Sequence, residues 1–362
     1  MLPPTRPPWT TLLPPVALVV LAAVWGRDLP PVLVALVAAV LAGAVLAAVH
    51  HAEVVAHRVG EPFGSLVLAV AVTVIEVALI VTLIVSGGPE TASLARDTVF
   101  AAVMITVNGI LGLSLFVAAR RDHVAVFNAE GTGAALATVT TLATLSLVLP
   151  TFTTSEPGPQ FSPGQLVFAA VASLAVYGMF VFTQTVRHRD FFLPAPQDAV
   201  ASSDEHAVPP TTRVAATSLG LLVVALVAVV GLAKVESPAI ESGVEAVGFP
   251  PSFVGVVIAL LVLLPETLAA VRAARRGLVQ TSLNLALGSA MASIGLTIPV
   301  IALASIWIDG PLVLGLQSTQ LVLLALTVVV GVLTVVPGRA TRLQGGIHIA
   351  LMAAFLFLAV SP

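Results

Sequence analysis

The sequence predicts an all-α polytopic membrane protein with about 11 transmembrane helices. Of its 362 residues, 58% are hydrophobic and 9% are charged, whereas an ordinary soluble domain has about 25% charged residues. Apolar stretches of roughly 20 residues recur along the chain, and each is long enough to cross a bilayer core of about 30 Å as a helix. Residues 213–233 and 321–336 are apolar on every face, which excludes the alternating polarity of membrane barrel strands.

Eleven apolar stretches mark the predicted spans. The first is short and rich in proline, and we expect it to be retained as a span, because no small-residue cleavage site follows a short hydrophobic core. In chain order, the predicted spans cover residues 11–25, 30–49, 63–86, 98–119, 133–151, 165–186, 213–233, 249–271, 281–304, 311–336 and 345–361.

The distribution of basic residues predicts the orientation. With 11 spans, one side of the membrane receives 12 of the 15 basic residues, and the other receives only Arg27, Arg96 and Lys234. Cytoplasmic loops of membrane proteins carry the excess of lysine and arginine. The sequence therefore predicts a multi-pass protein of the inner (plasma) membrane, embedded in the lipid bilayer, with a cytoplasmic N-terminus and a C-terminus outside.

The spans divide into an N-terminal helix and two halves of five. Residues 1–28 hold the first helix, residues 29–186 the first half and residues 213–362 the second, with a polar cytoplasmic linker at 187–212. An odd number of spans gives the halves opposite orientations. That arrangement is typical of inverted-repeat transporters, whose ion sites lie near the membrane midplane.

Each half carries an acid inside a predicted span, Glu76 in the third and Glu266 in the eighth. The positions match, since Gly64 precedes Glu76 by 12 residues and Gly255 precedes Glu266 by 11. A charged group at mid-membrane costs at least about 2.5–3.5 kcal/mol on insertion scales. Two such acids facing each other would hold either two protons or one divalent cation. That exchange is the chemistry of a proton-coupled antiporter; the alternative is that each acid is paired for helix packing.

Three further polar residues are candidate oxygen ligands of a transported cation: Thr73, one turn from Glu76, Asn108 in the fourth span and Ser289 in the ninth. A threonine or serine in a membrane helix can instead bond its own backbone. Pro265 removes a backbone hydrogen bond beside Glu266. The freed carbonyl is a possible ion ligand, or the proline only kinks the helix.

Two acids, Glu53 and Glu245, lie just before the third and eighth spans and are candidate access-path residues that guide protons or cations to the site. The alternative is that both are solvated loop carboxylates. His50, His51 and His57 share the segment of Glu53, and interfacial histidines without a metal role are the commoner case.

Other classes of function find little support. The chain has no cysteine, no HExxH motif and no aspartate pair within a span, so we expect a secondary transporter and not an enzyme, with no cofactor. The net charge of −3 gives no indication of a nucleic-acid partner.

Two segments carry a resemblance to a known family. The stretch from His51 to Leu66, continuing as Val74-Ile75-Glu76-Val77, resembles the ChaA-type calcium/proton antiporters of the calcium/cation antiporter superfamily. So does Leu264-Pro265-Glu266, followed by Asn284 to Ala290 and by Ile298-Pro299. The resemblance covers almost the whole chain.

The resemblance implies two inverted repeats with one essential acid in each, Glu76 and Glu266, and a calcium/proton antiporter that exports Ca²⁺. It also implies that Asn108 and Ser289 fall in the second helix of each repeat's ion-binding pair. Other calcium/proton exchangers of the superfamily have Gly-Asn-x-x-Glu at each acid, where this chain has Val72-Thr73 and Val262-Leu263. A monovalent (Na⁺ or K⁺)/proton antiporter with the same site therefore stays open as the alternative.

Overall fold

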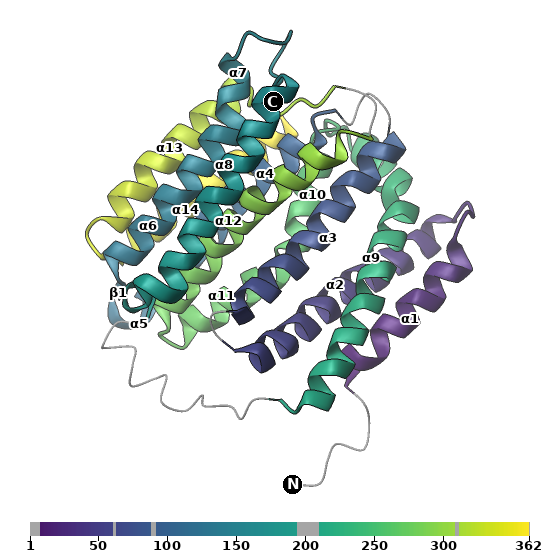
Figure 1. The fold of residues 1–362 in the computed structure, drawn as a ribbon, viewed down its shortest axis with the longest axis horizontal. Helices are drawn as coiled ribbons and strands as arrows, with labels where there is room; N and C mark the ends of the chain where they lie inside the picture. Colours follow the sequence, from purple (N-terminus) through teal and green to yellow (C-terminus); the bar gives the residue numbers. More distant parts are fainter. Residues whose placement is uncertain (1–7, 61–62, 88–91, 194–209, 308–310, 362) are drawn as a thin grey trace. The chain divides into compact units, whose positions relative to one another are not determined.

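A computed structural model describes residues 8–60, 63–87, 92–193, 210–307 and 311–361. The described chain is helical apart from two short strands, and it forms two compact units. Unit 1 consists of residues 1–87 and 207–248, and unit 2 of residues 88–206 and 249–362. Each unit therefore combines segments from both halves of the sequence (Figure 1).

Unit 1 contains the four helices α1 (Trp9–Val24), α2 (Pro31–Val59), α3 (Phe63–Gly87) and α9 (Thr212–Ala246). The long helices α2 and α9 are antiparallel neighbours, because Arg58 at the end of α2 donates from Nη2 to Thr212 Oγ1 at the start of α9, at 2.8 Å. Both helices bury residues at alternating spacings of three and four, the pattern of a coiled-coil seam. The buried positions are 37, 41, 44, 48, 51 and 55 in α2 and 215, 218, 222, 225, 229, 232 and 236 in α9.

Helix α1 packs on α2 and α9 through small residues and a freed carbonyl. Pro14 has no N–H, so the carbonyl of Thr10 lacks its usual helical donor, and the buried His51 bonds it from Nε2 at 2.9 Å. A side chain at Gly231 would collide with Leu21, since a Cβ there would lie 2.4 Å from Leu21 Cδ2. Pro14 thus creates the polar contact that orients α1.

Unit 2 contains all the remaining elements. Three of its helices continue through π-helical turns: α4 (Leu94–Met104) through Ile105–Ile110 into α5 (Leu111–Asp122), α6 (Ala129–Ala143) through Thr144–Val148 into α7 (Leu149–Phe152), and α8 (Pro163–Phe182) into Thr183–Arg187. The others are a 3-10 turn at Arg189–Phe192, α10 (Phe253–Val262), α11 (Leu264–Arg275), α12 (Val279–Ala304), α13 (Ser318–Val335) and α14 (Arg342–Val360). Strands β1 (Val124–Val126) and β2 (Arg339–Thr341) pair antiparallel, with Ala125 opposite Ala340.

Glycines bring α5 and α14 of unit 2 into close contact. A Cβ at Gly345 would lie 2.6 Å from the backbone nitrogen of Phe116, and one at Gly112 would lie 2.8 Å from His348 Cβ. Helix α12 crosses the same region, where the hydroxyl of Ser282 bonds that of Ser114 at 2.6 Å and the carbonyl of Ala270 at 2.7 Å. Small residues therefore set the interhelical distances, as is usual for helices in membranes.

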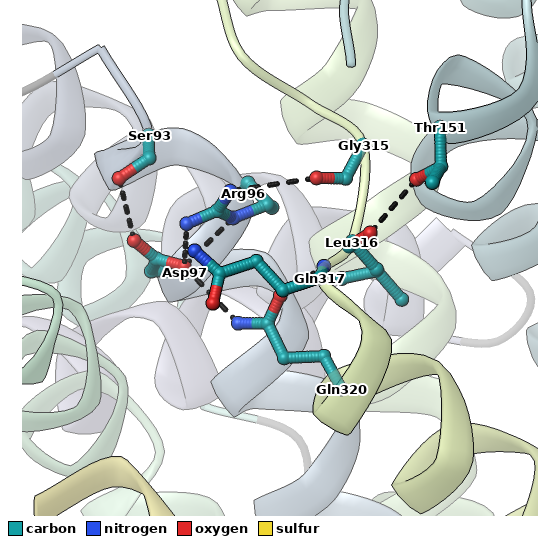
Figure 2. A network of polar contacts seen from close by, with 8 residues as sticks. All are labelled: Ser93, Arg96, Asp97, Thr151, Gly315, Leu316, Gln317 and Gln320. Carbon is teal, nitrogen blue, oxygen red and sulfur yellow. Dashed lines mark hydrogen bonds and ion pairs between the residues drawn. The ribbon is translucent and has the colours of Figure 1, made fainter. Parts of the chain in front are cut away.

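A buried ion pair connects α4 to the segment before α13. Arg96 and Asp97 are each 4% exposed, and Arg96 Nη2 lies 2.8 Å from Asp97 Oδ1. Ser93 and Gln320 also donate to Asp97, and Arg96 Nη1 donates to the carbonyl of Gly315 at 3.4 Å. Figure 2 shows these groups converging on Asp97, with Thr151 bonding the next carbonyl along. The carboxylate is thus neutralised inside unit 2.

Each of the 11 predicted spans coincides with a helical segment. Within the described chain, eight helices are long and apolar enough to cross a membrane, and α10 with α11 counts as a ninth if the bent pair is one span. The 16 residues of α1 fall short of that length. Two predicted ends are wrong: α2 continues ten residues past residue 49, and α9 thirteen past residue 233. Residues 311–317 were expected to be helical, but α13 begins only at Ser318.

The contact between α5 and α14 gives a prediction with an internal control. Gly345→Ala should lower stability by about 1–3 kcal/mol, because its methyl group meets backbone atoms of α5 that cannot move independently. Gly346→Ala adds the same methyl group where no atom lies within 4 Å. Thermal unfolding of the purified variants in detergent checks this, and equal melting temperatures would contradict the packing described.

The buried ion pair gives a second prediction. Asp97→Ala should destabilise the protein by about 3–5 kcal/mol, because it leaves the Arg96 guanidinium buried without a counter-charge. The double variant Arg96→Met/Asp97→Ala should recover much of that loss, since no charge then stays buried. Thermal unfolding of both variants tests the pair, and a double variant no more stable than Asp97→Ala would count against it.

Candidate functional site

The first predicted acid, Glu76, lies inside the continuous helix α3 of unit 1. Its side chain is 2% exposed, and that of Thr73, one turn earlier, is 5% exposed. Residues three apart lie on the same side of a helix. The structure therefore brings Glu76 and Thr73 to one buried side of α3, whereas Val74 on the other side is 43% exposed.

The second acid, Glu266, lies at a break between two helices of unit 2. Helix α10 ends at Val262, α11 begins at Leu264, and their axes differ by 53°. Pro265 stands in the first turn of α11 and frees the carbonyl of Leu261 from its helical bond. Glu266 follows in the same turn and is 9% exposed. The start of a helix carries unpaired N–H groups and a partial positive charge, which favour a carboxylate there.

This break explains how Glu266 can lie only six residues before Arg272. The helix continues beyond Arg272 to Arg275, so the acid lies at the bend in the first turn of α11 and the arginines lie in its last turn. A discontinuous helix whose half-helix terminus and freed carbonyl face an ion is the usual construction of transporter sites. Helix α3, which holds Glu76, has no such break.

Helix α12 presents hydroxyl groups at different depths. The predicted ligand Ser289 is only half-buried. Ser293 and Thr297, one and two turns further along α12, are 2% and 0% exposed. Sequence reasoning missed both, although the spacing of four residues from Ser289 to Ser293 and from Ser293 to Thr297 would have indicated them.

Thr297 has a counterpart in α4. Helix α12 runs antiparallel to α4 and α5, with the contact between Ser282 and Ser114 fixing the register. Thr98 lies 16 residues before Ser114 and Thr297 lies 15 residues after Ser282, so both lie at a similar level. Each is 0% exposed, and neither Oγ1 has a hydrogen-bond partner among the described residues. Unit 2 therefore holds two shielded hydroxyl oxygen atoms, one on α4 and one on α12, of the kind that coordinates cations.

Asn108 lies in the π-helical turn between α4 and α5 and is 0% exposed. Its Nδ2 donates to Thr327 Oγ1 at 2.9 Å, and its Oδ1 lies 3.0 Å from Nδ1 of the buried His348. The other ring nitrogen of His348 lies 3.2 Å from Thr334 Oγ1. The two ends of the Asn108 amide thus connect the π-helical turn to α13 and α14. A ligand role for Asn108 stays a prediction.

The two predicted access-path acids are not loop residues. Glu53 lies within α2 and is half-buried, and Glu245 lies in the last turn of α9 and is exposed. The loop interpretation was wrong because both helices continue past the apolar stretches that marked the spans. A different acid of α9, Glu236, is 2% exposed. Sequence reasoning missed it because the predicted span covers only residues 213–233.

The described start of the predicted linker, residues 187–193, packs against α8 and α12. Asn284 of α12 donates from Nδ2 to the carbonyl of Phe192 at 2.7 Å, and the ring of Phe192 meets that of Phe180 edge to face. Gln280 bonds Asn284 and also accepts from the backbone of Asn128 at 2.7 Å. The acids Asp198, Asp204 and Glu205 of the linker lie outside the described residues.

No cluster of three or more histidine or acidic side chains suited to holding a metal occurs in the part of the chain that the structure describes. Glu76 belongs to unit 1 and Glu266 to unit 2, so each acid is described with its own surroundings. A groove of about 600 Å³, lined by Thr151, Glu156 and Gln317 among others, includes none of the predicted site residues.

Comparisons with known proteins agree with the exchanger interpretation. The family described as sodium/calcium exchanger protein matches residues 29–186 and 217–361. The y4hA protein of Sinorhizobium fredii is 46% identical over 359 residues, covering 98% of this chain and 97% of the relative. The sodium-potassium/proton antiporter ChaA of Escherichia coli is 33% identical over 356 residues, covering 97% and 96%.

A solved structure shares the fold. The H⁺/Ca²⁺ exchanger CAX superposes with a TM-score of 0.73 at 17% identity, covering 96% of this chain and 86% of that one. At that identity the likeness shows the helical transporter architecture alone. The family match and the relatives establish more: this chain is a multi-pass inner-membrane protein that belongs to the sodium/calcium exchanger protein family.

Proposed function

We propose that the chain is a secondary active antiporter that exports Ca²⁺ in exchange for H⁺ through Glu76 and Glu266. The observation that carries the proposal is the burial of one carboxyl group in each unit, at 2% and 9% exposure. Membership of an exchanger family and likeness to an H⁺/Ca²⁺ exchanger support it.

The exchange follows from the charge on these groups. An ionised carboxylate shielded from water is unfavourable unless a cation neutralises it. A proton and a metal ion are therefore alternative occupants of the same oxygen atoms. Two carboxylates balance either two protons or one divalent ion, so we expect an electroneutral exchange of two protons for one Ca²⁺.

Each acid has candidate oxygen ligands within its own unit. In unit 1, Thr73 accompanies Glu76 on the same side of α3; in unit 2, the carbonyl of Leu261, freed by Pro265, precedes Glu266. Hydroxyl and carbonyl oxygen atoms suit Ca²⁺, which takes six to eight oxygen ligands. Asn108 and Ser289 complete the ligand set that the resemblance implies.

A second candidate is exchange of Na⁺ or K⁺ for H⁺ by the same groups. The relative that is 33% identical along nearly its whole length is described as a sodium-potassium/proton antiporter. The side chains before each acid, Val72 and Leu263 among them, add no amide ligands. A site with few side-chain ligands favours a laxer choice of ion.

The topology completes the proposal. The 12 to 3 distribution of basic residues favours a cytoplasmic N-terminus and an outer C-terminus. Residues 29–186 and 213–362 would then be inverted repeats, and the two segments matched by the family nearly coincide with them.

Transport by everted membrane vesicles tests the two acids. Addition of Ca²⁺ should collapse a respiration-driven proton gradient in vesicles with the wild type. Glu76→Gln and Glu266→Gln should each abolish the response, because an amide cannot exchange a proton for a cation. Glu130→Gln, which alters an exposed acid at the start of α6, is the matched control and should leave transport unchanged.

The same vesicles separate the two candidate ions. A response to Ca²⁺ alone supports the first candidate, and a response to Na⁺ or K⁺ without one to Ca²⁺ supports the second. The two-carboxylate mechanism would be overturned if no cation collapsed the proton gradient. It would also be overturned if Glu76→Gln and Glu266→Gln behaved as the wild type.

A further inference from the structure

The part of α9 beyond its apolar stretch carries a buried acid that the proposed exchange does not use. Glu236 is 2% exposed, and its Oε1 is shielded with no hydrogen-bond partner among the described residues. It occupies the last position of the buried stripe of α9, after Val229 and Leu232. A carboxyl group therefore takes a place that the pattern otherwise fills with apolar or small residues.

Glu236 lies at the edge of the membrane. Residues 214–233 hold no charge and span about 30 Å as a helix, so Glu236 comes three residues past the apolar core. Lys234 marks the same boundary on the opposite side of α9, where its ammonium lies 5.5 Å from the ring centroid of Trp25 at the end of α1. The distribution of basic residues favours the outer side of the membrane for this end of unit 1.

The stretch of α9 around Glu236 also holds a freed carbonyl and a second acid. Pro238 has no N–H, so it frees the carbonyl of Lys234, one turn back in α9. The next acid, Glu241, is engaged by Ser237, whose hydroxyl donates to it at 3.1 Å. A shielded carboxyl oxygen without a hydrogen-bond donor, as at Glu236, suits a proton or another cation.

Among the described residues of unit 1, no basic side chain is paired with Glu236. The charged and histidine residues of α2, from His50 to Arg58, lie at its opposite end, next to the start of α9. The described part of α1 carries no charged residue, the turn after it has the exposed Arg27 and Asp28, and α3 contributes only Glu76. On α9 itself, Lys234 is exposed and lies over Trp25.

We propose that Glu236 is a third ion-exchanging carboxylate, which takes up protons from the outer side and passes them into unit 1 toward Glu76. The proton moves from outer water to the carboxylate of Glu236, and from there inward as the exported cation leaves. The assignment rests on the proposed cation/proton exchange. It gives the access-path role to Glu236 in place of Glu245, which is exposed.

The test uses everted vesicles, whose lumen corresponds to the outer side, with the full-length protein. Glu236→Gln should slow cation-driven proton release by about tenfold or more, with the greatest loss when the lumen is least acidic and protons are scarce. Glu236→Asp keeps a carboxyl group and should restore most of the rate. Glu241→Gln and Glu245→Gln alter the next acids of the same helix and should match the wild type.

Each failure has a separate meaning. A wild type that exchanges no cation for protons overturns the proposed function. If the wild type is active and Glu76→Gln inactive, while Glu236→Gln matches the wild type at every lumen pH, the role of Glu236 is wrong. Equal losses in Glu236→Gln and Glu245→Gln would also contradict it. Labelling of the wild type by a hydrophobic carbodiimide, which modifies protonated carboxyl groups, should mark Glu236 and not Glu245; the reverse pattern contradicts the proposal.

Discussion

An ionised carboxylate shielded from water must be neutralised by a positive charge. Whether that charge is a fixed side chain or a mobile ion decides whether the carboxylate supports the fold or exchanges ions. The protein meets the requirement in two ways. Asp97 has a permanent partner in the adjacent Arg96, with Ser93 and Gln320 completing its bonds. This carboxylate keeps its charge and stabilises the packing of α4 against α13. Under the proposed function, Glu76 and Glu266 are neutralised by mobile ions. Glu236, whose Oε1 has no partner among the described residues, is neutralised in the same way if it relays protons as we propose.

Proline and glycine determine where the oxygen ligands and the close contacts fall. Pro14 frees a carbonyl that orients α1 through His51, and Pro265 bends the helix at Glu266. Gly112 and Gly345 let α5 and α14 approach so closely that any larger residue at either position would collide with the facing helix. In a membrane, where helices gain little from hydrophobic association, these backbone effects specify the fold.

The sequence predicted the membrane class and the approximate positions of the apolar helices, because apolar length and charge distribution are set by the bilayer. The family followed from a resemblance carried by the motifs around the two acids. It did not predict where α2 and α9 end. An apolar stretch measures the thickness of the membrane, whereas a helix continues as long as its backbone bonds and packing allow. That difference explains why a loop position was open as the alternative for Glu53 and Glu245, and why Glu236 was overlooked. Asn108 and Ser289 show a second limit, since composition identifies a polar residue in a span but not its partner or its depth.

The central claim is that protons and the transported cation compete for the same carboxyl groups. The most direct measurement is proton release when Ca²⁺, Na⁺ or K⁺ is added to the purified protein in a weakly buffered detergent solution. The account predicts that the transported ion releases protons as it binds, about two for each Ca²⁺, and that Glu76→Gln and Glu266→Gln each reduce the number. Cation binding without proton release would contradict it.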